Sequence, residues 1–297
     1  MSKKVAHLIF DVESVADGEL IANVRYPTES LSPTDAVKRY QDELLETTKR
    51  TFIPYTFQVP VSVVIAKVGP DMRLIDVVSL DEPQFRPHVI TENFWRGWEM
   101  YERPQWVTFN GRTFDLPIME LAAYRYGISL PGWFALGGYK APRNRYNTDA
   151  HFDLQELLTN FGAARLNGGL NLAAQMVGKP GKVGLKGEEV QQQYDAGNHQ
   201  GISDYCRCDV LDTYFVFLRC KVLTGNLTRD AEQQLVADAK AWIESRADEV
   251  QAYADYLEHW SEWNDPWQPE PEGENNQPDP DESPDPEDSE VSSTVAP

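Results

Sequence analysis

Four apolar runs of strand length divide the first 110 residues of the chain. The second and third are separated only by the turn-forming stretch "GPDM", which predicts a β-hairpin. Helical patterns follow the third and fourth runs, over 92–102 and over 115–127, where Gly127 ends the second of them. Strands and helices in this order predict an α/β fold with a mixed central sheet and helices on its faces. The four runs are "VAHLIF" (5–10), "VSVVIAKV" (61–68), "RLIDVVSL" (73–80) and "QWVTF" (105–109).

The remainder of the chain has helical patterns that are followed by an acidic tail. We expect short helical segments after a Gly- and Pro-rich loop, a helix around 202–222 and one long helix near 228–260. The net charge is −20, but twelve acids and no Lys or Arg lie in the last 36 residues, so the first 261 residues hold 35 acids against 27 bases, or −8. We therefore predict three parts: a domain over 1–225, a C-terminal helix over 226–261, and a disordered Pro-rich tail over 262–297, either a solvated spacer or a site for a protein partner.

The composition points to a cytoplasmic protein that does not enter a membrane. Three cysteines are too few for a disulfide framework and suit a reducing compartment. The N-terminal apolar run is interrupted by acids before it reaches the length of a signal peptide, and no later run is long enough to span a bilayer.

Two carboxylates follow the first apolar run directly. In "LIFDVESV", Asp11 and Glu13 are two residues apart, and side chains with that spacing on a strand point to the same face. Neighbouring carboxylates beside a core raise each other's pKa and destabilise the fold unless a cation neutralises them. Oxygen ligands of this kind suit Mg²⁺ or Mn²⁺, and the ends of strands are where open α/β sheets bind ligands.

A third carboxylate, Asp115, follows the fourth strand in "VTFNGRTFDLPIM", at the start of a predicted helix. The helix dipole favours a negative charge there. By itself this pattern is also explained by an ordinary helix cap.

The stretch "ISDYCRCDVLDTYFVFLR" raises the question of whether its cysteines or its acids carry chemistry. Cys206 and Cys208 are two residues apart on a helix, so they point in different directions and cannot both bind one metal ion; we expect them to be small core or surface residues. Tyr205 and Asp209 are four apart and share a face. A packed tyrosine and a solvated aspartate would fit that spacing equally well.

Taken together and in this order, the three motifs resemble those of the DEDDy 3′–5′ exonucleases. The resemblance is closest to the bacterial family of predicted exonucleases similar to the proofreading domain of family B DNA polymerases, and it spans about residues 5 to 222. The stretches "HFDLQELLTNFGA", "LNLAAQMVGKPGK" and "YCRCDVLDTYFVFLR" also look like that family. The resemblance implies a ribonuclease H-like fold and a free-standing nuclease, since no polymerase pattern follows.

The resemblance also implies a role for each motif residue. Asp11, Glu13 and Asp209 would hold a first divalent ion, Asp11 would bridge to a second, and Asp115 would reach the second directly or through water. The Tyr205 hydroxyl would orient the attacking water, a role that a histidine fills in the related DEDDh group. Two such ions, Mg²⁺ or Mn²⁺, clamp the attacking and leaving oxygens of a phosphoryl transfer. Asp212, about a turn beyond Asp209, is kept as a reserve ligand.

The sequence gives weaker indications of the residues that contact the substrate. We assign them to Asn110 and Phe114 of the second motif, and to Lys140, Arg143 and Arg145 in the basic, tyrosine-containing loop "GGYKAPRNRY", which is equally typical of a polar surface loop. Lys179 and Lys182 in "GKPGK" could face phosphate or simply end a helix.

Three functions compete at this point. The first is a 3′–5′ exonuclease that degrades single-stranded DNA from its 3′ end, which is favoured because all four carboxylates and the tyrosine are present. The second is a ribonuclease H-like nuclease that acts on RNA or duplex ends. The third is a non-catalytic nucleic-acid-binding scaffold that uses the acidic tail.

Overall fold

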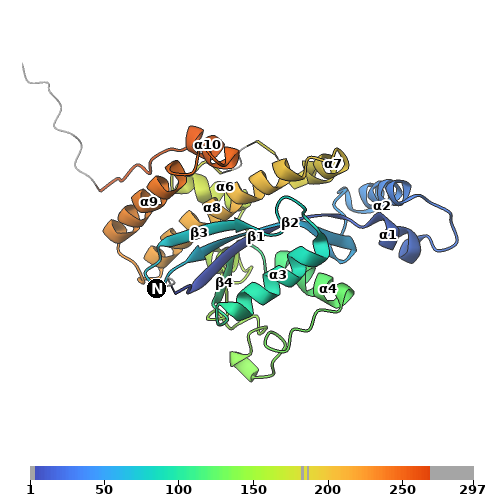
Figure 1. The fold of residues 1–297 in the computed structure, drawn as a ribbon, viewed down its shortest axis with the longest axis horizontal. Helices are drawn as coiled ribbons and strands as arrows, with labels where there is room; N and C mark the ends of the chain where they lie inside the picture. The colour runs from blue at the N-terminus through green and yellow to red at the C-terminus, as the bar shows by residue number, and fades with distance from the viewer. Residues whose placement is uncertain (1–3, 182–183, 186, 268–297) are drawn as a thin grey trace, which may run out of the picture. The chain divides into compact units, whose positions relative to one another are not determined.

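The computed structural model describes residues 4–181, 184–185 and 187–267, and contains a five-stranded mixed sheet (Figure 1). The strand order is β3-β2-β1-β4-β5. Within it β1 pairs with β2 and β2 with β3 in antiparallel fashion, whereas β1 with β4 and β4 with β5 are parallel. The strands are β1 (His7–Ala16), β2 (Gln58–Val68), β3 (Leu74–Ser79), β4 (Gln105–Thr108) and β5 (His151–Asp153).

This topology is that of the ribonuclease H-like fold, and the predicted α/β class with a mixed sheet is confirmed. The hairpin expected around "GPDM" is the β2–β3 pair. The strand β5 was not predicted, because three residues are too short for a periodic signal. In the described part of the chain, no helix combines the length and the apolar character needed to cross a membrane.

Helices cover both faces of the sheet, with α3 and α4 on one face and α6, α8, α9 and α10 on the other (Figure 1). The predicted helices over 92–102, 115–127 and 202–222 correspond to α3, α4 and α8. The helices are α1 (Gly18–Arg25), α2 (Pro33–Thr48), α3 (Pro87–Met100), α4 (Asp115–Tyr126), α5 (Leu154–Leu158), α6 (Gly169–Met176), α7 (Val190–Asp195), α8 (His199–Leu223), α9 (Arg229–Glu244) and α10 (Gln251–Glu258).

The prediction of one long helix near 228–260 is wrong, because the chain forms α9 and α10 with a break between them. Ile243 is buried in α9, and Ala252 is buried in α10. In one straight helix these residues, nine positions apart, would lie about 180° from each other. The break therefore lets both segments bury their apolar faces in the same core.

The alternation of side chains along β1 determines which layer each one enters. Leu8, Phe10 and Val12 pack in the core cluster beneath α3 and α4, whereas Ile9 packs in the cluster that contains α8. Since successive strand residues point to opposite faces, the odd-numbered positions after Ile9 face α8.

The segment after α10 is anchored to the core by aromatic and charged side chains. The Lys179 ammonium is buried and lies 3.9 Å from the centre of the Trp260 ring, and the Arg219 guanidinium lies 4.2 Å from that of Trp263. Gly178 has a φ of 68°, and a Cβ there would lie 2.6 Å from the Trp263 nitrogen, so the close approach requires glycine.

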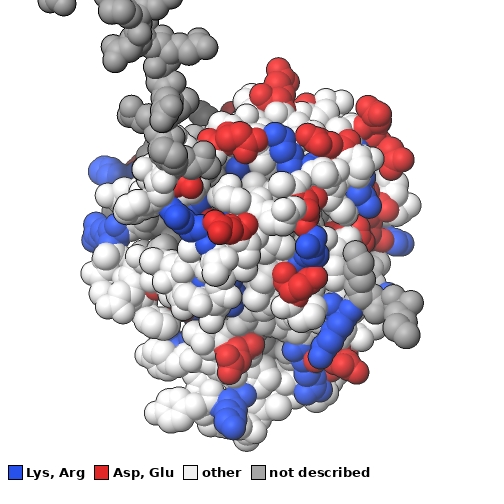
Figure 2. Space-filling model, turned by 90° about the vertical axis from the view of Figure 1, so that its left-hand side faces the viewer, with Lys and Arg blue, Asp and Glu red and all other residues white. Residues whose placement is uncertain are grey.

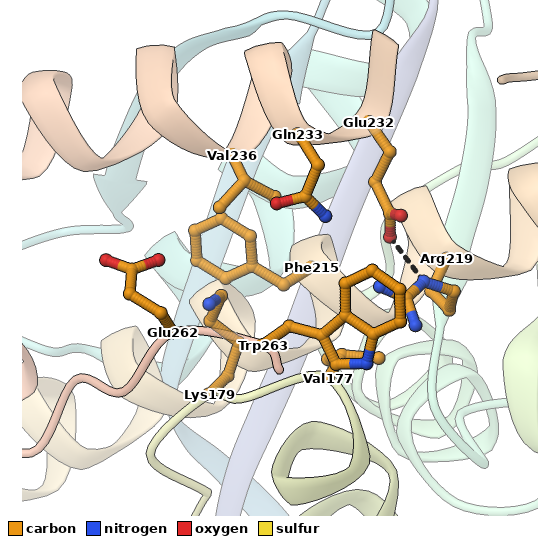
Figure 3. Close-up of a pocket in the computed structure, with 9 residues that line it drawn as sticks. All are labelled: Val177, Lys179, Phe215, Arg219, Glu232, Gln233, Val236, Glu262 and Trp263. Carbon is orange, nitrogen blue, oxygen red and sulfur yellow. Dashed lines mark hydrogen bonds and ion pairs between the residues drawn. The ribbon is translucent and has the colours of Figure 1, made fainter. Parts of the chain in front are cut away.

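The small cavity drawn in Figure 3 lies at this anchor. Its wall includes the ion pair in which Arg219 Nε donates to Glu232 Oε1 at 2.7 Å, the dashed contact of the figure. The cavity measures about 10 Å³, room for about one water molecule, so it is a packing feature rather than a ligand site.

The compact unit that begins at the N-terminus runs to Trp263 and includes α9 and α10. The predicted tail boundary at residue 262 thus falls two residues inside it. Residues 268–297 of the predicted tail lie outside the described residues, so their disorder stays a prediction.

Two truncations should separate the anchor from the tail. Deletion of 264–297 should leave the midpoint of thermal unfolding within about 2 °C of the full chain, because an acidic, Pro-rich segment contributes no core. Deletion of 260–297 should lower it by at least about 5 °C, because Lys179 and Arg219 lose their aromatic partners and 1 kcal/mol corresponds to about 2–4 °C at this size. Equal midpoints for the two truncations, measured by circular dichroism, would contradict the anchor.

Candidate active site

Asp11 and Glu13 lie inside β1 rather than at its end, because β1 continues to Ala16 alongside β2. What ends just before Asp11 is the parallel pairing of β1 with β4, which stops at Ile9 opposite Val107. Both carboxylates are at odd positions and so face α8. A register shift relative to β2 follows between Glu13 and Ser14.

Asp115 is hydrogen-bonded to β1 beyond the point where β1 stops pairing with β4. Its Oδ1 accepts a hydrogen bond of 3.0 Å from the Val12 backbone N–H, between the two β1 carboxylates in sequence. Asp115 is the first residue of α4 and is only 5% exposed. Its side chain therefore joins the start of α4 to β1, which a simple helix cap would not do.

The helix α8 brings the third motif to the same face of the sheet. The charge of Asp209 adds to the burial that raises the pKa of Glu13 and of Asp115, and the charges of Asp209, Glu13 and Asp11 add to the burial that raises the pKa of Tyr205. The structure thus brings together all five residues predicted to be catalytic. They come from three elements separated by about 90 to 100 residues in sequence: Asp11, Glu13, Asp115, Tyr205 and Asp209.

Cys206 also belongs to this cluster, which the sequence argument missed. Its Sγ lies 3.6 Å from Asp11 Oδ2 and 3.4 Å from the Asp11 carbonyl oxygen. One ligand atom from each of Asp11, Glu13 and Cys206 lies within 4.8 Å of the others. Helical spacing could have revealed this, since residues 205, 206 and 209 share one face of a helix.

The other cysteines are buried packing residues. Cys208 points to α10, where its Sγ lies 3.8 Å from the Ala252 carbonyl oxygen. The two cysteines of the Cys-x-Cys stretch therefore have different surroundings and do not form a joint metal site.

Burial and mutual repulsion perturb the acids of the cluster. Burial first, and then the charge of Asp115, raise the pKa of Asp11 to about 7. Burial likewise raises the pKa of Asp115 to about 7. The pKa of Glu13 is well above its ordinary value through burial and then through the charges of Asp11, Asp209 and Asp115. Such a group of carboxylates has the donor set of a divalent-cation site.

Asp212, the reserve ligand, is in a different place. It is fully buried and accepts a 2.7 Å hydrogen bond from the Tyr256 hydroxyl of α10. Its pKa is raised well above the ordinary value, by burial first. The geometry therefore pairs Asp212 with α10 and leaves Asp209 as the α8 carboxylate of the cluster.

The turn that carries the second motif is held by Asp153. The Asp153 carboxylate accepts the backbone N–H groups of Asn110 and Arg112, at 3.1 and 3.0 Å, and also those of the first turn of α5. Asp153 is thus the N-cap of α5 as well as the residue that holds this turn. Asn110 adopts a φ of 67°, and its side-chain oxygen accepts from Gln155 at 3.0 Å.

A groove of about 660 Å³ begins at Glu13. Asn110 and Phe114, two of the predicted substrate contacts, line it. The other lining residues come from the second half of β1, α2, the start of β2, α7 and two connecting segments: Ser14, Val15, Ala16, Gln41, Arg50, Thr51, Phe52, Ile53, Gln58, Gly187 and Gln191.

Lys140, Arg143 and Arg145 do not line this groove. Arg143 forms a two-pronged ion pair with Glu120, at 2.9 and 2.8 Å, and Arg145 pairs with Glu156 at 3.3 Å. Their contact with substrate stays a prediction.

Of the two lysines in "GKPGK", Lys179 is buried against Trp260 and does not face the groove, and Lys182 lies outside the described residues. On the face shown in Figure 2, basic and acidic side chains are interspersed.

The fold and the carboxylate cluster define a ribonuclease H-like protein with a candidate divalent-cation site. The chain belongs to the family described as predicted 3′–5′ exonucleases related to the exonuclease domain of PolB, whose model matches residues 50–267. The matched part includes Asp115, Tyr205 and Asp209, whereas Asp11 and Glu13 precede it.

Among solved structures, the family B DNA polymerase from the hyperthermophilic archaeon Pyrobaculum calidifontis is similar, at 13% identity and a TM-score of 0.45. The similarity covers 73% of this chain and 24% of that one, so the chain spans about a quarter of the polymerase. Among curated proteins, none matches the chain.

The raised carboxyl pKa values predict how a divalent ion should stabilise the protein. Between about pH 4 and pH 7 the folded cluster binds more protons than the unfolded chain, so this cluster loses stability as the pH rises through that window. A bound ion replaces those protons. Mg²⁺ or Mn²⁺ should therefore raise the unfolding midpoint more at pH 8 than at pH 5.

The measurement is the difference in midpoint with the ion and with EDTA at each pH. That difference removes the opposite pH dependence of His7 and His151, whose pKa values are lowered by burial. The variant Asp11→Asn should show a much smaller difference at pH 8. A metal effect of equal size at both pH values would contradict the site.

Proposed function

We propose that the protein is a metal-dependent 3′–5′ exonuclease that releases nucleoside monophosphates from the 3′ end of single-stranded DNA. The observation that supports this most strongly is the convergence of Asp11, Glu13, Asp115 and Asp209 beside Tyr205, with Glu13 lining a groove. A non-catalytic scaffold has no reason to hold four carboxylates together, because their repulsion destabilises the fold.

The carboxylates present suit divalent ions, and the proposal includes two of them. Asp11, Glu13 and Asp209 would hold the first ion, and Asp11 and Asp115 would hold the second. When bound, the ions supply Lewis acidity to the phosphate and lower the pKa of a bound water. The carboxylates are all hard oxygen donors, which favours Mg²⁺ or Mn²⁺ over softer metals. The Cys206 thiol is held against Asp11 and completes the buried wall behind it.

Tyr205 is proposed to position the attacking water. Tyr205 is 6% exposed, and burial and then the charges of Asp209, Glu13 and Asp11 raise the pKa of its hydroxyl. Beside these carboxylates the hydroxyl can orient a water molecule for in-line attack. The attack opposite the 3′-oxygen leaves the phosphate on the departing nucleotide.

A single strand is favoured over a duplex because of charge. Tracking along a duplex requires Lys and Arg over many phosphates, whereas the chain up to residue 261 has a net charge of −8. RNA is distinguished from DNA only by the 2′-hydroxyl, so RNA and duplex ends are included as substrates in the assay.

The carboxylate role is tested by a matched pair of variants on one helix. Asp209→Asn should lower kcat on a 5′-labelled single strand by at least two orders of magnitude, on the order of the several kcal/mol that a metal ion contributes. Asp212→Asn should keep kcat within about threefold, because Asp212 is bonded to Tyr256 instead. The opposite pattern, an active Asp209→Asn and an inactive Asp212→Asn, would move the third-motif role to Asp212.

The tyrosine role is tested by removal of one hydroxyl. Tyr205→Phe should lower kcat by about one to three orders of magnitude, as for loss of one positioned hydrogen bond, and leave oligonucleotide binding unchanged. Tyr214→Phe is the control. It also removes one buried tyrosine hydroxyl from α8, but that hydroxyl donates to the Met72 carbonyl at 3.0 Å. Products should form a ladder that shortens by single nucleotides from the 3′ end. Cleavage of a circular single strand would exclude an exonuclease, and wild-type rates for Tyr205→Phe would exclude this mechanism.

A further inference from the structure

Four consecutive residues that line the groove, 50–53, lie outside the three sequence motifs. The helix α2 ends at Thr48, and Lys49 then adopts a φ of 61°, which turns the chain back toward β1. Ile53 is buried in the small core between α1, α2 and the start of β2. Arg50 and Phe52 are consequently held on the groove side of an anchored segment.

Phe52 extends the aromatic surface of the site outward. It is 61% exposed, which is unusual for a phenylalanine, and its ring centre lies 5.7 Å from that of Phe114, with 47° between the ring planes. Phe114 directly precedes Asp115 and is partly packed in the core below α4. The two rings therefore form one aromatic surface next to Asp115, and Phe52 is its more exposed part.

Among the described residues that line the groove, Arg50 is the basic one. Within the described residues its guanidinium takes part in none of the ion pairs, whereas on the adjacent helices Arg25 pairs with Glu43, and Arg39 with Glu29. Many other cations in the described part of the chain are neutralised in that way. An exposed, unneutralised guanidinium in a groove that ends at a carboxylate cluster is suited to a phosphate group.

The remaining polar wall is uncharged and is held in place by the backbone of β1. Gln191 of α7 accepts the Ala16 N–H at 2.8 Å, and Gln58 is bonded to Ser14 and donates to the Ile53 carbonyl at 2.6 Å. Because these side chains are already hydrogen-bonded within the protein, they shape the groove but have few free donors and acceptors with which to distinguish one base from another. The groove volume, about 660 Å³, lies in the range of about 300–1,000 Å³ typical of small-molecule sites.

We propose that Phe52 and Arg50 form a subsite for the nucleotide upstream of the cleaved bond, in which the base stacks on the Phe52 ring and a phosphate pairs with Arg50. The occupant is a single strand, because only an unpaired base exposes a face for stacking. The subsite is independent of base identity, since stacking uses the ring face. This inference rests on the proposed exonuclease function and adds to it two residues outside the three motifs.

The test compares two substrates of the full-length protein with Mg²⁺. One is a 5′-labelled oligonucleotide, and the other is the p-nitrophenyl ester of thymidine 5′-phosphate, in which p-nitrophenol replaces the upstream strand. Phe52→Ala should raise KM for the oligonucleotide by about 5- to 100-fold, as for loss of one stacked base, and Phe52→Trp should retain it. Arg50→Gln should also raise KM, and it should reduce the slope of log KM against log salt by about 0.7.

Neither variant should change kcat or KM on the nitrophenyl ester by more than about twofold. Tyr124→Ala and Arg96→Gln, at an 87% exposed aromatic residue and an exposed arginine that do not line the groove, are the matched controls and should behave as wild type on both substrates.

The outcomes separate this inference from the function on which it rests. A wild-type protein inactive on both substrates would overturn both. An active wild type with unchanged KM for Phe52→Ala and Arg50→Gln would overturn the subsite and leave the exonuclease assignment intact. Equal losses on the oligonucleotide and the nitrophenyl ester would overturn the upstream placement.

Discussion

The structure depends on the point at which β1 loses its parallel neighbour. Pairing with β4 stops at Ile9, while β1 continues to Ala16 against β2. An N–H group beyond that point has no strand partner on the open edge, and the Asp115 carboxylate accepts the one at Val12. This single hydrogen bond places the start of α4, and with it Phe114 and the groove, against the two carboxylates of β1.

The second constraint is that like charges are buried together. Asp11 and Glu13 follow Ile9 on the face that packs against α8, so in an ordinary α/β protein they would be apolar. Their raised pKa values measure the cost of holding them there without a cation. Buried positions occupied by charged instead of apolar side chains lower the stability of the fold, and they are expected at functional sites, where the charged groups are needed for the chemistry.

The helix α8 has polar side chains on two opposite sides, and the contacts on each side fix the orientation of the helix. Tyr205, Cys206 and Asp209 face the sheet and the carboxylates. One turn further on, Asp212 is bonded to Tyr256 of α10, and near it Lys179 is covered by Trp260. The last helices therefore support the back of the helix that supplies the third motif, although they contribute no residue to the site. This explains why the compact unit continues to Trp263.

Local pattern determined the main strands and helices, because apolar runs and helical spacing are read within a window of about 15 residues. It also predicted that Tyr205 and Asp209 share a face and that Cys206 and Cys208 do not. The break between α9 and α10 and the strand β5 were decided by tertiary packing, since each depends on a partner distant in sequence.

The same distinction applies to the site. That Asp11 and Glu13 share a face follows from their spacing, but their meeting with Asp115, Asp209 and Cys206 depends on the end of the β1–β4 pairing and on the packing of α8. The separation of Asp209 from Asp212, only three residues apart on one helix, required the position of α10. Whether Arg50 had an acidic partner could be decided only once the side chains around it were in place.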